Sequence, residues 1–185
     1  LKNDVYNPPS FAELVRRFPA PAIPVANLNS EESVAKLREL APDVVLLDGS
    51  AIIKKRIFEI PRLGAINAHP GLLPEYRGVD SVRWAIYHGD PVCGTAHFID
   101  DGLDTGAILV RREAPWKVGE TILEVRVRVM RVCAELIREA VEGLADGTIA
   151  PKPQQKDEGR YFSWAPEEVK QAVDEILAGK RKLGT

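Results

Sequence analysis

Residues that cross-link chains or bind metals are scarce in this sequence, which has two cysteines and three histidines among 185 residues. Cys93 and Cys133 lie far apart, without the close pairing of a zinc site or the density of a disulfide framework. We therefore predict no metal site. Free cysteines are usually buried, so both thiols are expected in the core of a protein from a reducing, cytoplasmic compartment.

Long apolar runs and an excess of one charge are also missing. No apolar run approaches the roughly 20 residues of a membrane span, and no secretory signal opens the chain. The 25 lysines and arginines face 27 aspartates and glutamates, which gives a formal net charge of −2. This balance gives no basis for a membrane or a nucleic acid as the main partner. The length is enough for one domain with its own core.

Helix and strand patterns alternate in the first half of the chain. Asn29 or Ser30 can cap an amphipathic helix, and the run Val44–Leu47 then has the continuous apolar character of a strand buried on both faces. A short helix is expected over 54–60 and a strand over 64–69. This order is typical of α/β proteins, and it predicts a mostly parallel, doubly wound sheet with helices on both faces.

The longest helix is expected to open at 119–121 and to run to about 146–147, because apolar residues recur there at helical spacing. The arginines within it are expected on its solvent-exposed face. The simpler interpretation is that they are only solvated there, and the alternative is that they bind an anionic substrate. A polar arm, an aromatic segment and a last helix follow. We predict an α/β domain over 1–150, with the arm and helix of 151–185 packed on it or extending from it.

Two polar residues mark the carboxyl end of the strand predicted at 64–69. Asn67 and His69 are two residues apart, a spacing that places both side chains on one face of a strand. Pro70 and Gly71 then end the strand. Open α/β sheets keep their ligands at the carboxyl ends of strands. The loop 100–106 follows another predicted strand and can bring the carboxylate of Asp104 to the same place.

These three residue types suit chemistry at a carbonyl group. An asparagine N–H can hold a carbonyl oxygen as it gains negative charge, and a histidine can move a proton or donate to that oxygen. A nearby carboxylate would favour the charged imidazolium. Because no activated serine or cysteine accompanies them, the nucleophile would come with the substrate. The simpler interpretation is that Asn67 and Asp104 form turns and His69 is a hydrogen-bonded strand-end residue.

The same stretch resembles the signature of folate-dependent formyltransferases, which include glycinamide ribonucleotide, methionyl-tRNA and sugar-nucleotide formyltransferases. Residues 66–78 read INAHPGLLPEYRG, and the likeness continues through GTAHF at 94–98 and DGLDTG at 101–106. The resemblance implies that Asn67 binds the formyl oxygen, that His69 is the acid/base and electrostatic partner, and that Asp104 orients the histidine. His97 is expected to pack or form hydrogen bonds, since a second acid/base is not needed.

The resemblance further implies a Rossmann-like fold and 10-formyltetrahydrofolate as the formyl donor. The folate would lie between the loop after the Val44–Leu47 strand and the loop that carries Asp104. The residues expected to bind it are Ser50, Ala51, Ile52, Ile53, Asp100, Asp101 and Gly102. The formyl acceptor is expected to be the primary amine of a small molecule, phosphorylated or nucleotide-linked, with tRNA as a less expected acceptor.

One departure from the family pattern concerns the front of the chain. Family domains open with a strand, a glycine-rich turn and a helix, and this sequence shows no such opening. The N-terminal part of the domain is therefore expected to be truncated or missing, which would leave an exposed sheet edge. Three functions stay open: transfer of the formyl group to an amine, hydrolysis of 10-formyltetrahydrofolate to formate, and folate binding without catalysis.

Overall fold

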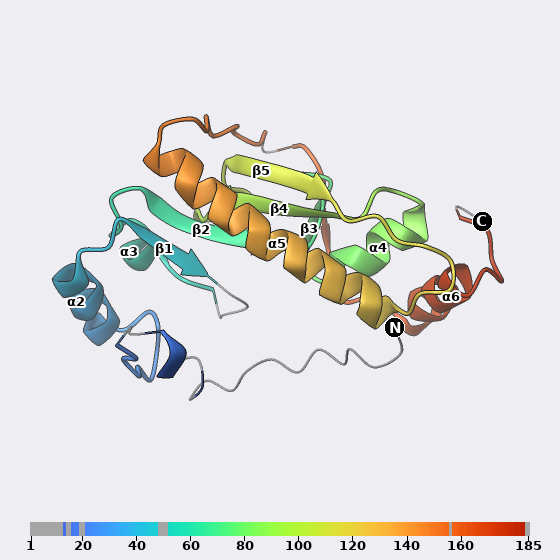
Figure 1. Cartoon of the computed structure of the whole chain (residues 1–185), viewed down its shortest axis with the longest axis horizontal. Coiled ribbons are helices and arrows are strands. Elements are labelled where there is room, and N and C mark those ends of the chain that lie inside the picture. The colour runs from blue at the N-terminus through green and yellow to red at the C-terminus, as the bar shows by residue number, and fades with distance from the viewer. Residues whose placement is uncertain (1–12, 14–15, 19–20, 48–51, 156, 184–185) are drawn as a thin grey trace.

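A mixed four-stranded sheet with a long helix across one face forms the centre of the protein (Figure 1). The computed structural model describes residues 13, 16–18, 21–47, 52–155 and 157–183. The elements, in chain order, are α2 (Glu31–Leu40), β1 (Val44–Leu47), α3 (Lys55–Phe58), β2 (Gly64–His69), β3 (Tyr76–Gly78), α4 (Ser81–His88), β4 (Cys93–Phe98), β5 (Ile108–Glu113), α5 (Ile122–Ala145), β6 (Arg160–Phe162) and α6 (Glu167–Leu177).

The main sheet has the strand order β1-β2-β4-β5. β1 and β2 are parallel, whereas β4 is antiparallel to both β2 and β5. The predicted α/β class is confirmed, but the expectation of mostly parallel strands is wrong for the described residues. For the β4–β5 pair the physical reason is the short connection over 99–107, which can join these strands only as antiparallel neighbours. Strand β4 enters the sheet antiparallel to β2 after the longer segment that holds β3 and α4.

Helix α5 covers one face of this sheet. Thr121 and Glu124 form a reciprocal capping box at its start, and its buried stripe runs along one side from Val125 to Gly143. Leu136 and Ala140 pack there against Ile66 of β2 and Ala96 of β4. The long helix predicted from apolar spacing is therefore confirmed, with its ends one to three residues inside the predicted bounds.

Helices α2 and α3 lie against the opposite face. Val34 of α2 and Ile57 of α3 pack with Ala65, the neighbour of Ile66 on β2. Because successive strand residues point to opposite faces, Ala65 and Ile66 face different helices. The expectation of helices on both faces is thus confirmed, and Ser30 caps α2 as predicted by accepting a bond from the Ser33 N–H.

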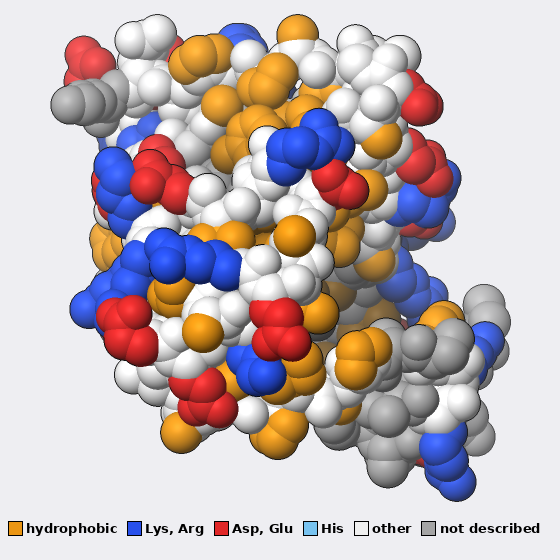
Figure 2. All heavy atoms as spheres, turned by 90° about the vertical axis from the view of Figure 1, so that its left-hand side faces the viewer, with side chains coloured by type: hydrophobic (Ala, Val, Ile, Leu, Met, Phe, Trp, Pro, Cys, Tyr) orange, Lys and Arg blue, Asp and Glu red, His pale blue; other side chains and the backbone are white. Residues whose placement is uncertain are grey.

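Strand β1 is the outer strand of the described sheet, with β2 as its only neighbour. Leu46 leaves 48% of its surface exposed. The expectation of a strand buried on both faces is therefore wrong, because Leu46 lines an open groove between β1 and α5 instead of a packed interface. Figure 2 shows the end of the molecule near α2 and α3, where acidic and basic side chains are interspersed, as the near-neutral net charge predicts.

The C-terminal residues pack against the central elements. β6 pairs with β3 in a second, two-stranded sheet, and α6 buries Val169, Val173 and Ile176 in a core shared with α4 and α5. Before β6, the Gln154 side chain donates to the carbonyl oxygens of Asp104 (3.0 Å) and Gly106 (2.7 Å). The arm of 151–155 therefore holds the loop that carries Asp104. The division of the chain near residue 150 stays a prediction.

Both cysteines are buried and unpaired, as the sequence predicts. Burial raises the pKa of the Cys93 thiol to about 11 and that of Cys133 to about 12. Among the described residues, no helix is long and apolar enough to cross a membrane.

Candidate functional site

A cleft of about 520 Å³ opens beside the carboxyl ends of β1 and β2. Its apolar walls come from the ends of β1 and β4, the segment before α3, the loop after β4, and α5. They are formed by Leu47, Ile52, Ile53, Ile99, Leu103 and Met130. Four polar side chains also line it: Asn67, His97, Asp100 and Asp104. An apolar cleft with a few converging polar groups is the usual form of a small-molecule site.

Asn67 lies near the end of β2, directly across the sheet from His97 on β4. Its side-chain nitrogen Nδ2 is 3.3 Å from Nε2 of His97. The other ring nitrogen of His97, Nδ1, is 2.7 Å from the carbonyl oxygen of Phe98. Burial lowers the pKa of His97 below its usual value, despite the opposing effect of Asp104, so the neutral ring is favoured.

His69 is buried beneath the residues that line the cleft, and only 4% of the surface of His69 is exposed. Nε2 donates to the carbonyl oxygen of Tyr76 at 2.7 Å, and the Ser81 hydroxyl lies 3.1 Å from the same nitrogen. Because a carbonyl oxygen can only accept, this bond fixes the proton on Nε2. Nδ1 is thereby the nitrogen that can take up or release a proton.

Asp104 lies between the two histidines. Its Oδ2 is 3.6 Å from Nδ1 of His69, and its Oδ1 is 3.7 Å from Nε2 of His97. Oδ2 also accepts a bond from the Gly78 N–H at 2.8 Å. The backbone of Asp104 has φ 55°, a left-handed conformation that aspartate and asparagine adopt more readily than most residues. The loop thus brings Asp104 to the strand ends, where the sequence predicts it.

The residues expected to bind folate divide into two groups. Ile52, Ile53, Asp100 and Gly102 line the cleft. Asp101 is exposed and is not among the residues that line it, and Ser50 and Ala51 lie outside the described residues. Asp100 faces the loop's own backbone, since its Oδ1 accepts from the Gly102 N–H at 3.0 Å and the Thr105 hydroxyl at 2.6 Å. Asp100 therefore also shapes the loop.

Sequence reasoning did not predict that Met130 of α5 and Tyr161 of β6 line the cleft. It expected His97 to pack or form hydrogen bonds, which the structure confirms, but not to line the cleft. A signal for His97 existed, because it lies in the alternating segment 94–99 and in the motif next to the Asp104 loop. Met130 falls off the buried stripe of α5, and Tyr161 lies far along the chain, so their place at the cleft depends on tertiary packing.

Gly71 offers a test of how tightly His69 is held. A Cβ atom at position 71 would lie 2.5 Å from Nε2 of His69 and 2.8 Å from Cβ of Ser81. Gly71→Ala is therefore expected to lower the free energy of unfolding by about 1–3 kcal/mol and to displace the His69 ring from the Tyr76 carbonyl. Denaturant unfolding and the ¹⁵N chemical shifts of the His69 ring measure the two effects.

The matched control is Gly147→Ala, where φ is +68° and an added Cβ meets nothing within 4 Å. It is expected to cost stability through backbone strain while leaving the His69 resonances unchanged. Unchanged His69 resonances in Gly71→Ala would show that the ring is not confined as described.

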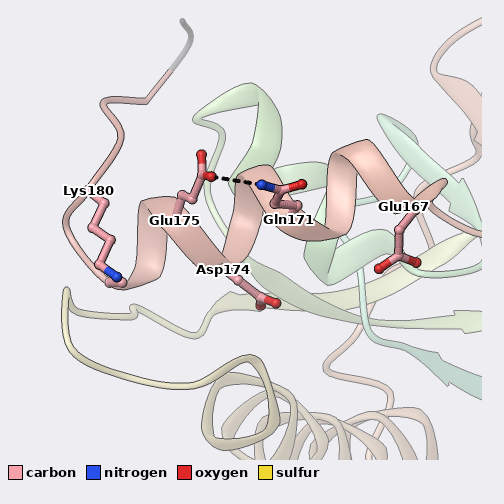
Figure 3. Close-up of a pocket in the computed structure, with 6 residues that line it drawn as sticks. Glu167, Gln171, Asp174, Glu175 and Lys180 are labelled. Carbon is pink, nitrogen blue, oxygen red and sulfur yellow. Dashed lines mark hydrogen bonds between the residues drawn. The ribbon is translucent and has the colours of Figure 1, made fainter.

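A second hollow, of about 440 Å³, lies on the outer side of α6 (Figure 3). Glu167, Asp174, Glu175 and Lys180 line it, and Gln171 donates to Glu175 at 3.2 Å. The figure shows these side chains spread along the helix surface rather than converging. No group of three or more acidic, histidine or cysteine side chains among the described residues could hold a metal ion. We therefore take the cleft beside β2 as the functional site.

Comparisons with known proteins bear on this site. Residues 10–141 match the family model described as formyl transferase. Among curated relatives, the methionyl-tRNA formyltransferase of Pelobacter propionicus is 36% identical over 149 residues, which cover 80% of this chain and 47% of that protein. The corresponding enzyme of Koribacter versatilis is 41% identical over 128 residues, covering 68% and 41%. The chain spans about half the length of the curated relatives it matches.

Solved structures of formyltransferases are also similar to this chain. A sugar N-formyltransferase from Shewanella sp FDAARGOS_354 is similar with a TM-score of 0.64 and 25% identity, covering 82% of this chain and 65% of that one. The formyltransferase PseJ from Anoxybacillus kamchatkensis, solved with a UDP-linked formamido sugar and tetrahydrofolate, has a TM-score of 0.69 at 24% identity. That match covers 94% of this chain and 96% of PseJ, and it supports the fold.

Proposed function

Because the chain belongs to the formyl transferase family, we propose that it transfers a formyl group from 10-formyltetrahydrofolate to a primary amine. The observation that carries the proposal is that Asn67 and Asp104 line one cleft, and that the Asp104 carboxylate also lies 3.6 Å from the ring of the buried His69. This distance is slightly longer than a hydrogen bond. Catalytic contacts are often long in ligand-free structures and shorten when substrate binds.

Each of the three side chains has a role that its surroundings support. The Asn67 side-chain N–H donates to the formyl oxygen as negative charge develops there during attack by the amine. His69 takes up or releases a proton at Nδ1, since Nε2 is committed to the Tyr76 carbonyl. Asp104 faces Nδ1 and can accept a hydrogen bond from it whenever that nitrogen carries a proton. When bound, 10-formyltetrahydrofolate supplies the formyl group and the leaving amine.

The shape of the cleft fits a folate. A pterin is a flat ring with apolar faces and a polar edge, so it needs apolar walls and a few polar groups. Ile52, Ile53 and Leu103 supply the walls, and Asp100 and Gly102 lie at the polar edge of the same cleft. We assign folate binding to these residues.

The acceptor is proposed to be an anionic amine. A second groove, of about 620 Å³, runs along α5 and shares Leu47, Ala68 and Met130 with the cleft. Arg126 and Arg131 line this groove; Arg126 pairs with Asp80, whereas Arg131 is exposed. Guanidinium groups bind phosphates well. The relatives make amino-sugar nucleotides and methionyl-tRNA the leading candidates, beside small phosphorylated amines such as glycinamide ribonucleotide.

The test is turnover of 10-formyltetrahydrofolate, followed by the absorbance of the tetrahydrofolate product. An amino-sugar nucleotide, glycinamide ribonucleotide and methionyl-tRNA serve as acceptors, with formate measured when none is present. Formylation of one acceptor, well above the rate of formate release, is expected. Formate release at the same rate with and without acceptors would support a hydrolase instead. Folate binding with no turnover of either kind would mean a binding protein.

A further inference from the structure

One buried polar contact of the cleft has no part in the roles given above. His97 is 2% exposed, and its Nε2 lies 3.3 Å from the Asn67 amide nitrogen and 3.7 Å from an oxygen of the Asp104 carboxylate. Burying a polar ring is costly unless its nitrogens are hydrogen-bonded. Both nitrogens of His97 have a partner within reach, the Phe98 carbonyl oxygen at Nδ1 and the Asn67 amide at Nε2.

The Phe98 carbonyl determines which nitrogen of His97 carries the proton. A carbonyl oxygen accepts and cannot donate, so Nδ1 must be protonated to make this bond. In a neutral ring, Nε2 then has a lone pair and can only accept. Burial favours that neutral ring. The contact of 3.3 Å is consequently a hydrogen bond from Asn67 to His97.

This bond also determines which way the Asn67 amide faces. With Nδ2 directed at His97, one N–H is used there, and the other stays available on the same nitrogen. Asn67 lines the cleft. If the amide were turned over, its oxygen would face the lone pair of Nε2, an arrangement with no hydrogen bond. The unprotonated Nε2 of His97 cannot donate a hydrogen bond to the Asp104 carboxylate. Of the two histidines, only His69 can then donate to this carboxylate, through Nδ1.

We propose that His97 is a positioning residue that holds the Asn67 amide with a free N–H directed into the cleft. The proposal rests on the proposed function, since it concerns the donor to the formyl oxygen. His97 acts through Asn67 and needs no contact with the substrate. The register between β2 and β4 pairs Asn67 with His97 and sets this contact.

Two substitutions of different chemistry test the proposal. His97→Phe keeps a flat ring in the space but has no acceptor, so kcat for formyl transfer is expected to fall by about 10- to 100-fold, the size of effect that misplacement of a reacting group causes. KM for 10-formyltetrahydrofolate should stay within about threefold, because the cleft walls are unchanged. His97→Gln can again offer an oxygen near the position of Nε2, and it is expected to recover most of kcat.

A double variant shows whether His97 acts through Asn67. When Asn67 is already alanine, adding His97→Phe is expected to change kcat by less than about twofold, since the two effects belong to one interaction. The Asn67 side-chain amide resonances in ¹H–¹⁵N spectra give a readout apart from activity. The two amide protons should differ clearly in shift in the wild type and in His97→Gln, and approach each other in His97→Phe.

The outcomes separate the two proposals. The positioning role is overturned if His97→Phe keeps wild-type kcat and amide shifts, if His97→Gln loses as much as His97→Phe, or if the losses multiply in the double variant. Those results would leave formyl transfer by the wild type intact. A wild type that neither formylates an acceptor nor releases formate overturns the proposed function, and the positioning role with it.

Discussion

Replacing Asn67 with alanine is expected to lower kcat for formyl transfer by about 10²–10³-fold, the usual loss when one donor to a developing oxyanion is removed. The Asn67 amide is a neutral side-chain donor that lines the cleft, and it lies near the end of β2. KM for the folate is expected to change much less, because the apolar walls remain. Steady-state kinetics with the best acceptor, together with thermal unfolding, measure both effects.

The control for this variant is Gln171→Ala, which removes a side-chain amide on α6, away from the cleft (Figure 3). It is expected to leave kcat unchanged. Turnover by Asn67→Ala within a few-fold of wild type, in a folded protein, would remove the proposed role of Asn67. A loss confined to KM would mean that Asn67 helps to bind substrate without assisting the reaction.

Asp104→Asn is expected to lower kcat by about 10²-fold, at the lower end of the range for proton-transfer groups. Asparagine tolerates the left-handed backbone found at this position, and its side-chain oxygen can still accept from the Gly78 N–H. The substitution therefore removes the negative charge that faces Nδ1 of His69 while keeping the shape of the loop. Kinetics and the thermal midpoint are measured on the same preparation.

Asp101→Asn is the matched control, because it makes the same chemical change three positions earlier in the loop. Asp101 is exposed and does not line the cleft, so its kcat is expected to stay within about twofold, as for most surface substitutions. Equal losses in the two variants would point to the general charge of the loop. No loss in Asp104→Asn would mean that His69 works without this carboxylate.

The parts of the fold that depend on local pattern could be predicted from the sequence. Ser30 caps α2, and the apolar spacing of Val125, Val129 and Cys133 locates α5. The direction of β4 depends on how the chain returns to the sheet, and the exposure of Leu46 depends on which element lies beside β1. Neither is encoded in the spacing of residues within the strands themselves.

The same distinction between local sequence pattern and tertiary packing applies to the site. Asn67 reaches the cleft because it lies near the carboxyl end of β2, where α/β sheets keep their ligands. Asp104 follows a strand that is antiparallel to β2, so its place beside His69 depends on the path of the loop 100–106 and not on chain order. The burial of His69 and the pairing of His97 with Asn67 depend on strand register and on the path of 70–76, which carries the Tyr76 carbonyl back to the ring. A one-residue change of register would exchange the faces on which these side chains lie.

Gln154 has a consequence for binding that extends beyond the cleft. Its amide nitrogen bonds the backbone on both sides of Thr105, and its oxygen accepts from Arg77 at 2.8 Å. A ligand that orders the 100–106 loop would therefore also order the C-terminal arm. A change that loosens the arm would in turn weaken binding of that ligand, by the free energy that couples the arm to the loop. This reciprocity is a requirement of thermodynamic linkage, and it makes a residue outside the motif a determinant of affinity.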